Sequence, residues 1–198
     1  MKKLLFVFLF FFCLTPFAFA ETEASTDIVT TVINPFKNPT LTPSGHKYKV
    51  LLGVNYRNTN MWGFSSRGTK NDLLGDNLRP TLLKNDCDIV YFGAEHSKLL
   101  LDKGYADFTA AEKADLIDVF KNYGFDYLIL FDLDPVHFAF PFGFSASAYV
   151  KVIDMHKASY VYTGKISKLT KFGGIGTPVS KIGLDVTNVL NAKIFDVK

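Results

Sequence analysis

The sequence predicts an α/β fold: a mixed β-sheet covered by helices, in which three helix-separated strands are followed by an antiparallel hairpin and a C-terminal helix. Two observations predict it. Up to about residue 134, strand-like apolar segments alternate with segments of helical spacing. Beyond that point, SASAYVKVID and ASYVYTGKIS are separated only by Met155-His156-Lys157, which is typical of a β-hairpin. Alternation favours parallel pairing and a hairpin is antiparallel, so the sheet is mixed.

The first three strands are predicted from runs of β-branched and aromatic residues. These runs are YKVLLGVNY (48–56), CDIVYFG (87–93) and FDYLILFDLD (125–134). A helix is expected over 69–83, with Pro80 expected to kink or end it early, and a shorter helix over 95–104 closes at a glycine.

The helix predicted over 109–123 has the clearest end signals. Thr109-Ala110-Ala111-Glu112 has the pattern of a capping box, and Gly124 supplies a left-handed cap. Its core-facing side is expected to carry Ala114, Leu116, Ile117 and Phe120. Further on, Thr177 is the expected N-cap of a C-terminal helix that has Pro178 in its first turn.

The chain begins with a segment typical of a secretory signal peptide. Two lysines precede an apolar run that ends in Ala18-Phe19-Ala20, a small-x-small cleavage pattern. We therefore expect an exported protein, periplasmic or extracellular, cleaved after Ala20. The predicted organisation is a signal peptide over 1–20, a flexible or extended lead-in over 21–46 that is rich in Thr, Pro and Ser, and a single α/β domain over 47–198.

The charge balance argues against one class of partner, and the cysteine count argues against an internal disulfide. Without residues 1–20, 20 basic residues face 19 acidic ones, which argues against a nucleic-acid partner. Only Cys87 then remains, so the domain has no internal disulfide, and this cysteine is expected to be a small buried residue.

Asp132-Leu133-Asp134-Pro135-Val136 matches the D-x-D-x-[TV] pattern of haloacid-dehalogenase-type phosphatases. In that chemistry the first Asp attacks phosphorus, the second is acid and base, and Mg²⁺ bridges them. Only 62 residues follow Val136, and they predict a hairpin and one helix rather than further strand–helix units. The preferred interpretation is that both aspartates mark the end of a buried strand. A secreted Mg²⁺-dependent phosphatase-like hydrolase using Asp132 and Asp134 is the alternative.

Other chemical motifs are incomplete. Gly63 to Lys70 resembles a phosphate-binding loop, but its last two residues are reversed, Thr-Lys instead of Lys-Ser/Thr. The four histidines, His46, His96, His137 and His156, do not have metal-ligand spacing. FGGIGT (172–177) is interpreted as a flexible turn. We therefore predict no catalytic residue, no metal site and no cofactor.

The unusual feature is VHFAFPFGFSASAYV. In an extended chain Phe138, Phe140, Phe142 and Phe144 would project from one face, and such a stripe is usually core. Exposed, it would mark a protein partner or, less favoured, a membrane. We expect Phe138 to be structural and Phe142 to be the most exposed. The candidate partner-binding residues are Phe140, Phe142 and Phe144, with Trp62 and Phe64 on a predicted loop.

The stretches HSKLLLDKGYADFTAAEKADLIDVFKNYGFDYLILFDLD and YVKVIDMHKASYVYTGKIS resemble one group of bacterial envelope proteins. The group comprises the curli-secretion channel lipoprotein, the outer-membrane activators of penicillin-binding proteins and the amino-terminal domain of the Tol-system propeller protein. The shared pattern is a glycine-aspartate approach to a strand, here Gly124 to Asp126, and a hairpin turn with an Asp, here Asp154. Lys157-Ala158 replaces the frequent Thr-Gly.

This resemblance implies a non-enzymatic envelope accessory or assembly domain. It would act through protein–protein interaction, with an envelope protein or a second copy of itself as partner. The lipidation cysteine of such lipoproteins is missing here, since no small residue precedes Cys13.

Overall fold

The computed structural model describes residues 46–56 and 72–195, apart from the side chain of Asp76. Trp62 and Phe64 lie outside the described residues. The division into a signal peptide, a lead-in and a domain stays a prediction.

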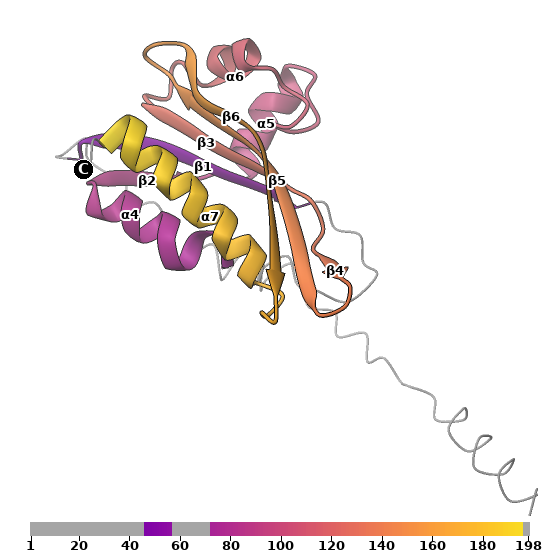
Figure 1. The fold of residues 1–198 in the computed structure, drawn as a ribbon. Coiled ribbons are helices and arrows are strands. Elements are labelled where there is room, and N and C mark those ends of the chain that lie inside the picture. Colours follow the sequence, from indigo (N-terminus) through magenta and orange to yellow (C-terminus); the bar gives the residue numbers. More distant parts are fainter. Residues whose placement is uncertain (1–45, 57–71, 196–198) are drawn as a thin grey trace, which may run out of the picture. The chain divides into compact units, whose positions relative to one another are not determined.

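The described residues form a six-stranded mixed sheet with helices on both faces (Figure 1). Its strands are β1 (Tyr48–Tyr56), β2 (Cys87–Tyr91), β3 (Tyr127–Leu133), β4 (His137–Ala139), β5 (Gly143–Asp154) and β6 (Ser159–Lys171). β1 pairs in parallel with β2 and β3, whereas β5 pairs antiparallel with β3, β4 and β6. The predicted mixed α/β fold is confirmed.

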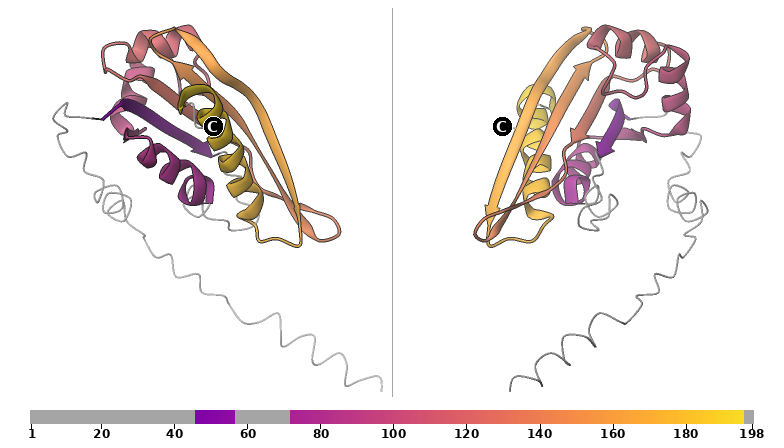
Figure 2. Two further views of the ribbon diagram at one scale, coloured as in Figure 1. Left: turned by 60° about the vertical axis from the view of Figure 1, so that its left-hand side comes forward. Right: turned by 90° about the vertical axis from the view of Figure 1, so that its right-hand side faces the viewer.

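Strand alternation divides the apolar side chains between two cores. On one face, Ile129, Phe131 and Leu133 of β3 lie in a cluster with residues of α4 (Arg79–Lys84) and α7 (Thr177–Leu190). On the other face, Leu128 and Leu130 lie in a cluster with residues of α5 (Ala94–Asp102) and α6 (Lys113–Phe120). Figure 2 shows this helix–sheet–helix layering from two sides. Since neighbouring side chains point to opposite faces, β3 is apolar at nearly every position.

The helix that contains Pro80 does not break there. Residues Leu74–Leu78 form a π-helical turn directly before α4, closed by the Arg79 N–H donating to the Leu74 carbonyl, and Pro80 lies in the first turn of α4. Proline lacks an N–H and its ring crowds the carbonyl four residues earlier. The wider π turn provides the space, so the predicted kink is a local change of helix type.

The predicted capping box at Thr109 is wrong. α6 begins at Lys113 with Glu112 as its N-cap, and the Asp115 carboxylate accepts the Glu112 backbone N–H at 3.0 Å. Asp107 instead accepts the backbone N–H of Thr109 at 2.7 Å and holds a turn before the helix. Aspartate side chains compete well with other acceptors for backbone N–H groups. Because Asp107 and Asp115 take these groups, the helix begins later than predicted.

Some smaller expectations also change. α6 ends at Phe120 rather than Tyr123, and Ala114 is exposed, but Gly124 has the predicted left-handed backbone, with φ +68°. α7 includes Thr177, so Gly176 takes the N-cap place expected for Thr177. Cys87 is buried as expected, and burial raises its pKa to about 12.

The turn between β5 and β6 explains two residues of the family-like pattern. The Asp154 carboxylate accepts the backbone N–H groups of His156 at 3.0 Å and Lys157 at 2.9 Å. Asp126 accepts the Lys49 N–H at 2.6 Å and also contacts the His156 ring. Both aspartates therefore organise the backbone at this end of the sheet.

Candidate functional site

Five large apolar side chains gather at one end of the sheet, and we call them the apolar tip. Phe140 is 92% exposed and Phe172 86%, while more than half of each remaining side chain is exposed; the set is Phe138, Phe140, Phe142, Leu169 and Phe172. The Phe142 and Phe172 rings stack with centroids 6.2 Å apart. The preferred core interpretation of the phenylalanine run is therefore wrong.

The tip exists because β5 and β6 are longer than β3. β3 pairs with β5 only from Ala148 onward, and the first residues of β5 pair with the short β4. This end projects past the helix-covered part of the sheet (Figures 1 and 2). The chain turns between β4 and β5 at Phe140 to Phe142, so these rings do not share one strand face as the sequence suggested.

The tip is apolar on both faces of the hairpin. Phe144 shares a strand face with the buried Ala146 and Ala148, so it lies on the side of the sheet that α7 covers. Phe138 pairs with Phe144 and therefore lies on the same side. Leu169 pairs with Ser145 and points to the opposite face. Phe138, expected to be structural, is thus exposed, and Phe140 rather than Phe142 is the most exposed ring.

The predicted partner-binding residues and the residues of the apolar tip overlap only in part. Phe140 and Phe142 belong to the tip, while Phe144 is half-buried with its ring edge-on to Phe138 at 5.8 Å. Leu169 and Phe172 were not predicted as site residues. Lys165, Ser167 and Leu169 stand at every second position and so share one strand face. An apolar Leu169 after two polar residues on that face was the sequence signal that could have indicated an exposed apolar side chain.

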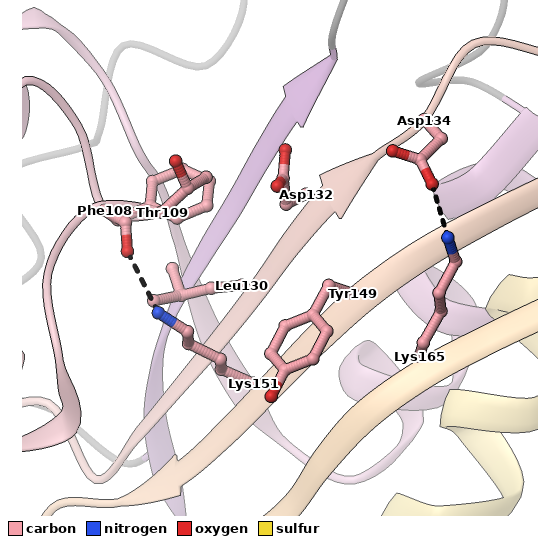
Figure 3. A pocket seen from close by; sticks show the side chains of 8 residues that line it. All are labelled: Phe108, Thr109, Leu130, Asp132, Asp134, Tyr149, Lys151 and Lys165. Atoms are coloured by element: carbon pink, nitrogen blue, oxygen red, sulfur yellow. Dashed lines mark hydrogen bonds and ion pairs between the residues drawn. The ribbon is translucent and has the colours of Figure 1, made fainter.

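A second feature is a polar groove of about 430 Å³ on the sheet face opposite α7 (Figure 3). Its floor is formed by alternate residues of β3, β5 and β6, and one wall is the loop before α6. The lining residues are Phe108, Thr109, Leu130, Asp132, Asp134, Tyr149, Lys151 and Lys165. Asp132 and Asp134 thus line a groove with two lysines, which the strand-end interpretation did not foresee.

The charged groups of the groove are already engaged within the protein. Lys165 lies 3.0 Å from the Asp134 carboxylate, which also accepts the Ser147 hydroxyl at 2.7 Å. The Lys151 ammonium donates to the Ala111 carbonyl at 2.8 Å, and its burial lowers its pKa. Asp132 is 9% exposed and accepts the Asn55 side-chain amide at 3.3 Å.

The sheet beside β3 differs from the series of parallel strands that the phosphatase alternative requires. Among residues 46–56 and 72–195, no three His, Cys, Asp or Glu side chains lie together as metal ligands. β3 is also flanked by the antiparallel β5 instead of a further parallel strand. In the same part of the chain, no helix is long and apolar enough to cross a membrane.

No protein-family model and no curated protein matches this chain. Solved structures do resemble it. The PelC dodecamer of Paraburkholderia phytofirmans has 6% identity and a TM-score of 0.47, covering 73% of this chain and 87% of that one. Lipoprotein GNA1162 of Neisseria meningitidis has 15% identity and a TM-score of 0.41, covering 71% and 99%. The LpoB C-terminal domain of Escherichia coli has 14% identity and a TM-score of 0.37, covering 72% and 93%.

All three identities are 15% or lower and all three TM-scores are below 0.5. Likenesses of this size assign neither an activity nor a partner to the chain.

Proposed function

We propose that this protein is an exported, non-enzymatic envelope domain that acts through protein–protein interaction, with the apolar tip as its binding surface. The exposed tip is the observation that carries the proposal. Its four phenylalanines expose the equivalent of about three whole side chains, or roughly 600 Å² at about 200 Å² each. A soluble monomer's largest apolar patch reaches about 300–600 Å², and such patches often bind partners.

The form of the tip favours a concave partner. Because apolar side chains lie on both faces and at the end of the hairpin, a flat surface would cover only some of them, whereas a pocket would enclose them. Residues 135–153 and 159–176 contain no Asp or Glu, and Lys171 is exposed beside the tip. An apolar pocket with an acidic rim is the complementary surface.

Export is supported by the signal-like segment 1–20, and the expected mature amino terminus is Glu21.

The test uses in-cell photocrosslinking from position 140 in the complete precursor, with position 101 as the control. Leu101 is 59% exposed on α5 and does not belong to the tip. A crosslinkable amino acid at 140 should capture a defined protein, and one at 101 should not. With that protein purified, the paired change Phe140→Ser with Phe142→Ser should weaken binding at least tenfold, or by about 1.4 kcal/mol.

Measuring the unfolding free energy of the paired variant shows whether weaker binding comes from the lost contact or from unfolding. Since both rings are largely exposed, the paired change should alter the unfolding free energy by no more than about 0.5 kcal/mol. Leu83→Ser with Leu101→Ser changes two side chains elsewhere that are each more than half exposed, and it should leave binding intact. Adducts to lipid alone, with liposome flotation lost in the Phe140→Ser/Phe142→Ser chain, would contradict the proposal and identify the tip as a membrane contact.

A further inference from the structure

The polar groove has the position and composition of a ligand site that is separate from the apolar tip. It lies on the sheet face near the carboxyl end of β3, where Asp132 pairs with Asn55 of the parallel strand β1. Ligands of open α/β sheets characteristically bind outside the carboxyl ends of parallel strands. A volume of about 430 Å³ is within the usual range for small-molecule sites.

The charges of the groove favour a ligand without net charge. Two carboxylates, Asp132 and Asp134, face two ammonium groups, Lys151 and Lys165, so the fields largely cancel. Lys165 is held by Asp134, and Lys151 is turned to the carbonyls of the loop before α6. A phosphate or a free carboxylate would have to compete with these contacts for its counter-charge.

The same groups keep capacity for hydrogen bonds. An ammonium has three N–H donors and a carboxylate about four acceptor positions. Only one of the three Lys165 donors is accounted for by Asp134. The Thr109 hydroxyl lies in the same groove and can both donate and accept. Donors and acceptors that line the same groove suit a ligand that carries many hydroxyl groups.

Tyr149 adds a flat apolar surface among these polar groups. It pairs with Lys165 across the strands and shares a strand face with Lys151, so its ring lies between the two lysines (Figure 3). Its side chain is 45% exposed, and the Thr163 hydroxyl donates to its phenolic oxygen at 3.3 Å. An anchored, half-exposed ring can stack against the C–H face of a pyranose.

From these observations we propose that the groove binds a neutral saccharide, with Tyr149 as the stacking platform and Asp132, Asp134, Lys151 and Lys165 as hydrogen-bonding partners of its hydroxyl groups. The site is a binding site without a chemical step. It is independent of the apolar tip, since no residue belongs to both.

The experiment is an amide-resolved NMR titration of the full chain after residue 20 with three neutral probes: maltotriose, cellotriose and triacetylchitotriose. At least one should bind with a Kd at or below about 10 mM, shifting amides of β3, β5 and β6 around the groove. Tyr149→Ala should weaken that binding at least tenfold, whereas Tyr149→Phe should change it less than threefold because the ring remains. Inorganic phosphate, an anion, and L-alanine, a zwitterion with a free carboxylate, serve as comparison ligands that carry ionic groups.

Three results would overturn the proposal: no binding of any probe at about 10 mM, tighter binding of phosphate or alanine than of the best saccharide, or unchanged affinity in Tyr149→Ala. Unaltered melting of Tyr149→Ala checks that the fold is kept, as its exposed position predicts. The Phe140→Ser/Phe142→Ser chain should bind saccharide normally, so a failure at the tip and a failure in the groove are distinguishable.

Discussion

Gly183 is the position where one added carbon should disturb the fold most directly. It is buried in α7, where a Cβ would lie 2.2 Å from the Leu73 backbone carbonyl oxygen. That is about 1 Å inside ordinary contact, and the neighbouring atom belongs to backbone that cannot turn aside. Gly183→Ala must therefore push α7 away from the helix that contains Leu73.

The expected loss has two opposing parts. Alanine favours a helix over glycine by about 1 kcal/mol, whereas overpacking in a close-packed core costs about 1–3 kcal/mol and more where backbone must move. Because backbone must move at Gly183, we take the overpacking cost as about 2–4 kcal/mol, which leaves a net loss of about 1–3 kcal/mol in the unfolding free energy. For a domain of this size the melting temperature would fall by about 2–12 °C.

Urea unfolding followed by far-ultraviolet circular dichroism measures this loss, with Gly75→Ala as the matched control. Apart from its chain neighbours and its own helix backbone, no atom lies within 4 Å of a Cβ built at Gly75, so alanine there should be neutral or stabilise by up to about 1 kcal/mol. If Gly183→Ala proved as stable as the parent chain, the close crossing of α7 over Leu73 would be wrong.

Two further changes test the turn and a buried histidine. Ala158 lies in the turn between β5 and β6 with φ +50°, a left-handed backbone conformation that glycine adopts more easily than alanine. Ala158→Gly should therefore raise the unfolding free energy by up to about 1 kcal/mol. A lower unfolding free energy in urea would contradict the left-handed assignment. Burial lowers the pKa of His96 below its ordinary 6.5, although Glu95 opposes the shift, and its Nδ1 accepts the Gly93 N–H at 3.1 Å. The unfolded chain then binds more protons, so stability should fall as the pH drops from about 6.5 toward the folded-state pKa. His96→Asn should flatten this dependence, and an unchanged slope in urea titrations at several pH values would refute the assignment.

Local sequence signals predicted the elements because they depend on near neighbours. Strand-like runs located β1, β2 and β3, and the short Met155-His156-Lys157 connection located the long hairpin. The failures were also local. Asp115 accepts the Glu112 N–H that the Thr109 hydroxyl was expected to accept, and Asp107 accepts the Thr109 N–H that Glu112 was expected to accept, so the start of α6 moved by several residues.

The sequence by itself therefore determined the order and type of the main elements, but not the short β4 or the π-helical turn before α4. Only the tertiary structure decided which aromatic residues stay uncovered and which polar residues meet. A run such as Phe138 to Phe144 alternates in the same way whether helices cover it or not, and its exposure follows from β5 extending past β3. Likewise Asp132, Tyr149 and Lys165 come from three strands, and strand register alone brings them to one groove. Register is set by the whole sheet, since each side chain's face depends on the pairing of strands far apart in the chain.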